Sequence, residues 1–116
     1  MANKFRIPKE IEEEIRKRDE NCVYCKKPMI SPWQSSNRRD SATIEHLREI
    51  KPFYWTDETG LRTSLKKEEL AICCGACNSS RGKKKIRSWL QKKNIDETTV
   101  ADVVKEYIRK YESLNP

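Results

Sequence analysis

Four of the five cysteines form two identically spaced pairs that are suited to bind a metal ion. The pairs are Cys22-x-x-Cys25 and Cys74-x-x-Cys77, and 48 residues separate them. Two residues between thiolates let one turn of backbone aim both sulfurs at the same ion, and zinc prefers four such ligands in a tetrahedron. The spacing therefore predicts a structural four-cysteine zinc site. Cys73 lies outside it, because using Cys73 would lengthen the second pair to C-x-x-x-C.

Two other interpretations of the cysteines carry less weight. A redox function of the thioredoxin kind needs one C-x-x-C near a βαβ pattern, whereas this chain has two pairs and lacks that pattern. Inert buried cysteines are the second alternative. Disulfides are disfavoured, because the number of cysteines is odd and the expected compartment is reducing.

The only histidine, His46, has neighbours that suit hydrolytic chemistry. A neutral imidazole accepts a proton from water near neutral pH. Glu45 precedes it on a predicted strand, so the two side chains should point to opposite sides. Asn78 follows the last cysteine of the zinc site, and carboxylate and amide oxygens are ligands for a hard divalent cation. The plainer alternatives are a surface carboxylate at Glu45 and a helix cap at Asn78.

Five elements are expected to position these residues. In order, they are a helix over 8–19, strands over 43–47 and 70–73, a helix after the Asn78-Ser79-Ser80 cap, and a helix over about 98–113. Residues 30–42 and 48–66 are predicted connections. The last helix carries an apolar stripe that predicts core packing: Val100, Val103, Val104, Tyr107, Ile108 and Tyr111. If the stripe has more apolar side chains than the core of one chain buries, the rest would form a dimer interface. The sequence therefore fits both a monomer and a homodimer.

Composition limits the class of protein. The chain has 116 residues, which predicts one small domain over 1–116. Because 37% of its residues are charged and only 35% are hydrophobic, we expect the domain to need a further stabilising element, such as a metal site, besides its core. No apolar run approaches the roughly 20 residues of a membrane span, and the first residues lack the apolar stretch of a signal peptide. We therefore expect no membrane partner and a cytoplasmic location.

A basic stretch follows the predicted zinc site. Net charge is +7, and seven basic residues without an acidic one lie between Ser79 and Lys93. Such residues neutralise phosphates and give affinity for DNA. The predicted DNA-binding residues are Arg81, Lys83, Lys84, Lys85 and Arg87, with Arg38 and Arg39 as weaker candidates. A solvated helix face is the alternative. Base contacts are a lesser expectation for the aromatic residues Phe53, Tyr54, Trp55, Trp33 and Trp89, for which packing is the commoner role.

These motifs together resemble the HNH endonuclease family, or ββα-metal nucleases, in its zinc-ribbon form. The resemblance covers roughly residues 10–90. It rests on Cys22-x-x-Cys25, on Thr43-Ile44-Glu45-His46-Leu47, and on the run from Glu69 through Cys74-Gly75-Ala76-Cys77-Asn78 to Arg81-Gly82-Lys83. The combined order of these motifs is specific, whereas each alone is weak.

The resemblance implies roles for individual positions. Glu45 would be a catalytic-metal ligand, a position that is usually Asp in the family, and Asn78 the second ligand. His46 would be the general base. Glu69 stands where the family has a loop-steadying Asn, and a carboxylate does not donate the hydrogen bonds of an amide. Glu45 is one methylene longer than the usual Asp.

The resemblance also implies an activity and a fold. The activity is metal-dependent hydrolysis of DNA with Mg²⁺, Mn²⁺ or another divalent ion, leaving 5′-phosphate and 3′-hydroxyl ends, in a bacterial cell or phage-infected host. The fold is α+β: a small zinc-stapled ββα-metal domain with flanking N- and C-terminal helices, its core at about 10–90 and a helical extension at about 96–114. A non-catalytic zinc-ribbon module that binds nucleic acid is the main alternative. A zinc-stabilised interaction domain is a third, and it leaves the charge and the Glu45–His46 pair unexplained.

Overall fold

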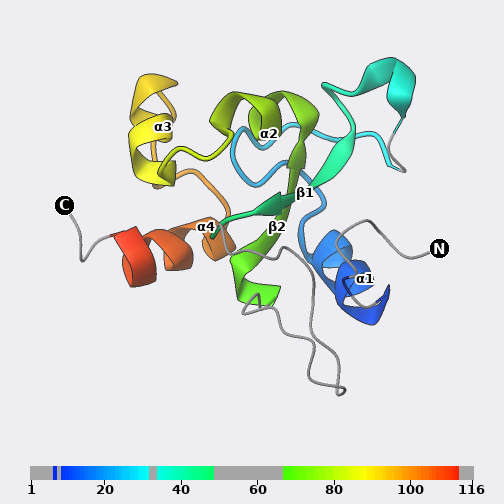
Figure 1. The fold of residues 1–116 in the computed structure, drawn as a ribbon, viewed down its shortest axis with the longest axis horizontal. Helices are drawn as coiled ribbons and strands as arrows, with labels where there is room; N and C mark the ends of the chain where they lie inside the picture. Colours follow the sequence, from blue (N-terminus) through cyan, green and yellow to red (C-terminus); the bar gives the residue numbers. More distant parts are fainter. Residues whose placement is uncertain (1–6, 8, 32–33, 49–66, 113–116) are drawn as a thin grey trace.

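A two-stranded antiparallel sheet lies between helices in this computed structural model, which describes residues 7, 9–31, 34–48 and 67–112 (Figure 1). Strand β1 spans Ala42–His46 and strand β2 spans Leu70–Cys74. Their register pairs Ala42 with Cys74 and His46 with Leu70. The protein is thus a small α+β structure, as the sequence predicts. Both strands begin or end within one residue of their predicted bounds.

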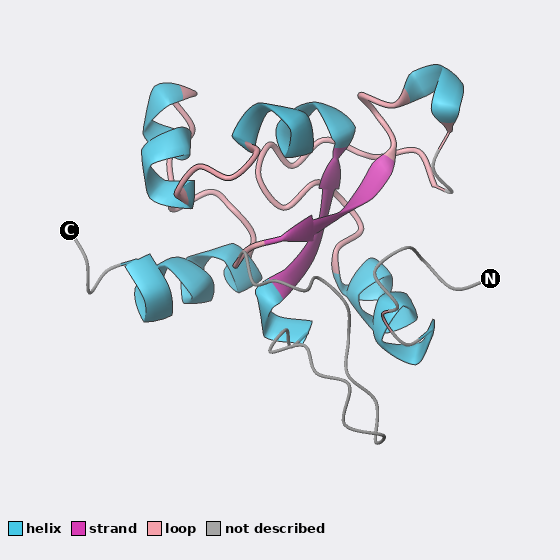
Figure 2. Ribbon diagram, in the orientation of Figure 1, coloured by secondary structure: helices cyan, strands magenta, loops and turns pink. Residues whose placement is uncertain are grey.

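Alternation along β1 divides its side chains between two cores. Thr43 and Glu45 face one side, and Ile44 faces the other with Ala42. The Ile44 side packs against helix α1, which spans Lys9–Arg18 and contributes the fully buried Ile15. The other side packs under α2, α3 and α4, the larger core. Figure 2 shows the two strands crossing the middle of the molecule between these helices.

Helix α1 forms for the reasons visible in its sequence. Acidic residues occupy its first turn and basic residues its last, which complements the helix dipole. The helix ends at a buried anchor: Asp19 accepts a hydrogen bond from the Ile72 backbone N–H (3.0 Å). Arg18 holds the same carboxylate with two nitrogens at 2.8 and 2.7 Å. This anchor fixes α1 to β2 just before the first cysteine pair.

The basic stretch forms two short helices instead of one continuous run. Helix α2 spans Gly75–Arg81 and α3 spans Ile86–Lys92. Gly82 separates them with φ of 55°, a backbone conformation that favours glycine. Asn78 therefore lies inside α2, whereas the sequence suggested it as a cap. Helix α2 starts in the second cysteine pair, with Cys74 at its N-cap.

The last helix begins later than the sequence predicts. Helix α4 spans Asp102–Tyr107 and continues as η3, one wider turn over Ile108–Glu112. The periodic stripe from Val100 suggested a start near residue 98. Instead, Val100 is buried in the core, and the Ala101 backbone N–H donates to the Val23 carbonyl (2.9 Å). That tertiary bond keeps the chain extended. The predicted core role of the stripe is confirmed for Val100, Val104, Tyr107 and Ile108.

Two single-turn helices complete the described structure. These are η1, Ser35–Asn37, in the segment before β1, and η2, Lys67–Glu69, immediately before β2. The segment before β1 closes on itself, because Ile30 and Asp40 join by a backbone hydrogen bond of 2.8 Å. Within the described part of the chain, none of the helices has the length and apolarity needed to traverse a lipid bilayer.

Candidate metal centre and its surroundings

The two cysteine pairs come together at one point of the fold. The sulfurs of Cys22, Cys25, Cys74 and Cys77 all lie within 4.8 Å of one another, and those of Cys25 and Cys74 are 3.9 Å apart. A tetrahedral zinc ion with Zn–S distances of about 2.3 Å places its sulfurs about 3.8 Å apart. The predicted four-cysteine cluster therefore has the dimensions of a zinc site. No disulfide joins these cysteines.

The first pair is held by a tight turn directly after α1. The Lys26 backbone N–H donates to the Cys22 carbonyl (2.9 Å), and Lys26 has φ of 69°. The Cys22 backbone N–H in turn donates to the Lys27 carbonyl (3.0 Å). These bonds close the turn, so both sulfurs point to the same side. Cys22 is buried, whereas Cys25 is exposed.

The second pair lies where β2 becomes α2. The Cys77 backbone N–H donates to the Cys74 sulfur (3.5 Å), which stabilises negative charge on a thiolate. The side-chain hydrogen bond with Cys77 lowers the pKa of Cys22 to about 4. The same bond raises the pKa of Cys77. Metals bind cysteine as the thiolate, so a cation at the centre of the cluster would displace the thiol protons.

Gly75 permits the close packing of the preceding segment on this pair. A Cβ at Gly75 would lie 1.8 Å from the Arg38 carbonyl oxygen. The Gly75 backbone N–H donates to the Ser41 carbonyl (3.1 Å), and that of Ala76 donates to the Arg39 carbonyl (3.0 Å). These bonds keep the 38–41 segment against the start of α2.

We expect Gly75→Ala to lower the stability of the zinc-loaded protein by at least about 1–3 kcal/mol, because overpacking against backbone has few ways to relax. Thermal unfolding followed by circular dichroism measures the change. Ser79→Ala is the control, since Ser79 is an exposed residue of the same helix. Equal melting temperatures for the two variants would show that the segment moves aside at little cost.

Glu45 is buried on the α2 side of β1 and holds two partners. Its Oε2 accepts a hydrogen bond from the Tyr24 hydroxyl (2.6 Å) and an ion-pair contact from Arg81 (3.2 Å). Burial raises the pKa of Glu45, while the Arg81 charge and the Tyr24 hydroxyl act in the opposite direction. Burial and the Glu45 charge also raise the pKa of Tyr24, which keeps its hydroxyl a donor. Glu45 is therefore not an ordinary surface carboxylate.

Asn78 lies over the same face of β1. Its Nδ2 donates to the Thr43 hydroxyl (2.9 Å) and to the Ile44 carbonyl (3.1 Å). The Thr43 hydroxyl donates onward to the Cys73 carbonyl (2.7 Å). Both side-chain hydrogen bonds of Asn78 use the amide nitrogen. Glu45 of β1 and Asn78 of α2 therefore lie at the same interface, between one face of β1 and the helix that covers it.

His46 is the last residue of β1 and is half-buried. Its carbonyl accepts a hydrogen bond from Arg81 (2.9 Å), which ties its backbone to the end of α2. By strand alternation its imidazole belongs to the opposite face from Glu45, as the sequence predicts. The imidazole therefore belongs to the face of β1 opposite to the one that Glu45 and Asn78 share.

Arg81 differs from the rest of the basic stretch. It is 5% exposed, and besides Glu45 and His46 its guanidinium donates to the Leu47 carbonyl (3.1 Å) and the Lys84 carbonyl (2.8 Å). The sequence assigned Arg81 to DNA, but its burial removes it from the surface candidates. The sequence did not distinguish Arg81 from its basic neighbours, because its buried partner, Glu45, lies 36 residues away along the chain.

The remaining basic candidates are at the surface. Lys83, Lys84 and Lys85 are exposed in the turn between α2 and α3. Arg87 is bound by Glu97 through two nitrogens, each at 3.0 Å, so a phosphate would have to replace that carboxylate. Arg38 and Arg39 are exposed, on the segment that packs against the start of α2.

The aromatic candidates have separate outcomes. Trp89 is buried, and its indole N–H donates to the Ser80 hydroxyl (3.0 Å), so packing is its role. The other aromatic candidates, Trp33, Phe53, Tyr54 and Trp55, lie outside the described residues.

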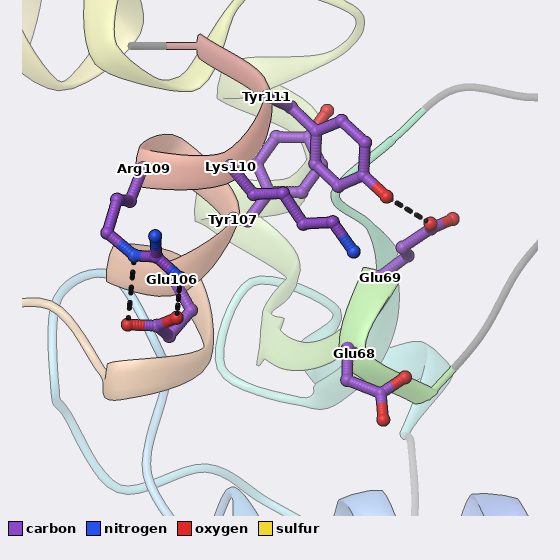
Figure 3. A pocket seen from close by; sticks show the side chains of 7 residues that line it. All are labelled: Glu68, Glu69, Glu106, Tyr107, Arg109, Lys110 and Tyr111. Carbon is purple, nitrogen blue, oxygen red and sulfur yellow. Dashed lines mark hydrogen bonds and ion pairs between the residues drawn. The ribbon is translucent and has the colours of Figure 1, made fainter.

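Glu69 lies beside a surface pocket between η2 and the last helix (Figure 3). It is 2% exposed, and its Oε1 accepts from the Tyr111 hydroxyl (2.9 Å) and from Arg48 (3.3 Å). The pocket has a volume of about 660 Å³ and is lined by Glu68, Glu69, Glu106, Tyr107, Arg109, Lys110 and Tyr111. The Glu69 backbone carbonyl accepts from the Leu47 N–H (2.9 Å), so this residue holds the chain just after His46.

Two residues that contact the candidate ligands were not predicted from the sequence. Tyr24 lies between the first two cysteines, and Thr43 lies two residues before Glu45 on the same face of β1. The Thr43 position was recoverable from strand alternation. The Tyr24 contact spans 21 residues and depends on how the first pair packs on β1.

Comparisons with known proteins leave the chain without an assigned family. No protein-family model matches it, and searches of curated proteins and of solved structures return no match.

Proposed function

We propose that this protein is a metal-dependent DNA endonuclease of the HNH type, with His46 as the general base. One observation carries the proposal: a hairpin and helix, β1–β2–α2, joined at a four-cysteine cluster, bear Glu45 and Asn78 on one face. This is the element order that the resemblance implies. His46 follows at the end of β1.

The donor set suits a hard divalent cation. Both contacts of Glu45 engage Oε2, and both contacts of Asn78 engage Nδ2, so Oε1 and Oδ1 remain as oxygen ligands. Magnesium and manganese prefer such oxygens. Arg81 already balances the charge of Glu45. A cation here would therefore bind weakly by itself and need phosphate oxygens of DNA to complete its ligands.

The residues of the chain divide the chemistry between them. His46, as a neutral imidazole, accepts the proton of the water that attacks the phosphate. Glu45 and Asn78 hold the cation from the β1 and α2 sides. A bound divalent ion supplies neutralisation of phosphate charge and stabilisation of the leaving oxygen. The four-cysteine cluster sets the scaffold, joining the end of β2 to the turn after α1.

The exposed lysines of the α2–α3 turn are the residues proposed to bind phosphate. Replacing Lys83, Lys84 and Lys85 together with alanine should weaken DNA binding, because fewer phosphates are neutralised. The slope of log K against log salt should fall by about 1 for each lysine that binds a phosphate in the wild type. Fluorescence anisotropy with a labelled duplex, between 50 and 200 mM salt, measures this slope.

The control for this variant removes the same charge elsewhere. Lys9, Lys17 and Lys105, on α1 and α4, replaced together with alanine, lower the net charge equally. We expect this control to keep the wild-type slope within experimental error. If both triple variants reduce the slope to the same degree, net charge and not the α2–α3 turn governs binding.

A non-catalytic nucleic-acid-binding module is the second candidate. The observation that favours it is the buried ion pair between Glu45 and Arg81, whose side chains are 4% and 6% exposed, respectively. This pair already occupies one oxygen of the carboxylate that the endonuclease would use for its cation. Such a module would keep the zinc and the exposed lysines, but it would not need His46.

Incubation with supercoiled plasmid distinguishes the two candidates. With Mg²⁺ or Mn²⁺ present, the endonuclease proposal predicts nicked or linear DNA, and EDTA added just before the substrate should stop the conversion. The zinc content is measured in the same samples, so that chelation of the structural ion is recognised. Binding without cleavage under every divalent ion would favour the module and overturn the endonuclease.

A further inference from the structure

A buried chain of contacts connects the four-cysteine cluster to the candidate cation ligand. Tyr24 lies between Cys22 and Cys25 and is fully buried. Its hydroxyl donates to Glu45 over 2.6 Å, and Arg81 approaches the same carboxylate from α2. The carboxylate is thus held from two sides by residues of separate elements.

The two contacts share one oxygen. The Tyr24 hydroxyl and the Arg81 guanidinium both donate to Oε2, so neither of these contacts uses Oε1. Hydrogen-bonding partners of this kind orient metal-ligating carboxylates in known metal sites. Tyr24 and Arg81 therefore hold Glu45 through Oε2, in the way expected for a carboxylate that binds a cation through its other oxygen.

Each support is itself fixed by packing. The Tyr24 and Trp89 rings pack edge-on with their centroids 4.9 Å apart, and the Trp89 indole N–H donates a hydrogen bond to Ser80 of α2. Arg81 is held by the carbonyls of His46 and Leu47, just where β1 ends. Neither side chain has freedom to follow a carboxylate that moves.

We infer that Tyr24 and Arg81 are positioning residues that orient Glu45 for the catalytic cation. The inference rests on the proposed function. It assigns a role to the hydroxyl inside the first cysteine pair, beyond the zinc ligands themselves. It also gives the buried Arg81 a purpose that DNA contact does not supply.

The test is the binding of Mn²⁺ to Tyr24→Phe, measured by water-proton relaxation without DNA or turnover, in a Mn²⁺ titration that extends far enough to saturate a site that binds weakly without phosphate. Phenylalanine keeps the ring against Trp89 and removes only the hydroxyl. We expect the Mn²⁺ dissociation constant to rise about 10-fold or more, the scale seen when an outer partner of a metal ligand is removed. Zinc content should stay at the wild-type value.

Tyr111→Phe is the matched control, because it removes a phenol that donates to a different buried carboxylate, Glu69 (2.9 Å). We expect wild-type Mn²⁺ affinity for this control. Equal Mn²⁺ affinity in Tyr24→Phe and wild type, with plasmid cleavage intact, would overturn the positioning role and leave the endonuclease standing. A wild type that neither binds Mn²⁺ nor cleaves would overturn both.

If the Tyr24→Phe variant does not fold, a measurement on the wild-type protein tests the inference instead. With ¹³Cζ-labelled tyrosine, Mg²⁺ should shift the Tyr24 resonance, because its hydroxyl bonds to the ligand, and leave the Tyr111 resonance in place. A Tyr24 signal that does not move at saturating Mg²⁺ would contradict the inference.

Discussion

Cys77→Ser should abolish tight zinc binding and unfold the protein. The four sulfurs join the turn after α1 to the junction of β2 and α2, next to a small core. Zinc binding to structural sites is worth about 10–16 kcal/mol at neutral pH, more than the stability of a typical domain. Zinc content by mass spectrometry under native conditions and folding by circular dichroism measure both effects.

Cys73→Ala is the control for this substitution. Cys73 is buried next to Cys74, but its sulfur is outside the four-cysteine cluster. We expect this variant to keep one zinc per chain and to lose only about 1 kcal/mol of stability, the scale of removing one buried heavy atom. A Cys77→Ser protein that stays folded after dialysis against a chelator would refute the structural role of the metal.

His46→Ala should lower the rate of plasmid cleavage by about 10²–10⁴-fold, the usual contribution of a general base. Zinc content should change little, because His46 lies outside the four-cysteine cluster, and the melting temperature is measured alongside it. The rate is measured under single-turnover conditions, with saturating protein and Mg²⁺ or Mn²⁺, so that DNA affinity does not enter.

Added imidazole separates a proton-accepting role from a structural one. If His46 accepts the proton, free imidazole in the space left by the substitution should restore part of the rate to His46→Ala and leave the wild type unchanged. A variant that keeps more than a tenth of the wild-type rate would remove His46 from the reaction. Absent activity without any response to imidazole, together with a lowered melting temperature, would assign His46 to the fold.

The sequence predicted the four-cysteine cluster well because the signal is local. Each pair has the C-x-x-C spacing that lets both of its sulfurs bind one ion, and together the two pairs supply the four ligands of a tetrahedral zinc. The strands were also predictable. Residues 43–47 start with two β-branched residues and then alternate in polarity, and a short apolar run starts at Leu70.

Long-range contacts set what the sequence did not predict. The start of α4 was wrong by four residues, because a hydrogen bond from Ala101 to Val23 outweighs the helical periodicity. The interior position of Arg81 was missed for the same kind of reason. In the sequence it is one of seven basic residues, and only the folded chain shows that Glu45 holds it.

The roles of Glu45 and Asn78 stay predictions from the sequence. Their placement on one face follows from strand alternation and from helix α2, which starts at Gly75. The ion pair with Arg81 could not be foreseen, and it changes the expected behaviour of the site. Arg81 already balances the charge of Glu45, so the proposed function requires phosphate oxygens of DNA to complete the cation site.

The central claim is that one ββα frame holds two ions, a sulfur-bound zinc and an oxygen-bound divalent ion. The most direct measurement is anomalous diffraction from crystals of His46→Ala bound to a DNA duplex and Mn²⁺. We predict a zinc peak among the four sulfurs and a manganese peak within about 2.6 Å of Glu45 Oε1, Asn78 Oδ1 and a phosphate oxygen. Manganese absent from Glu45 and Asn78, with the duplex bound and Arg81 still on the carboxylate, would contradict the claim.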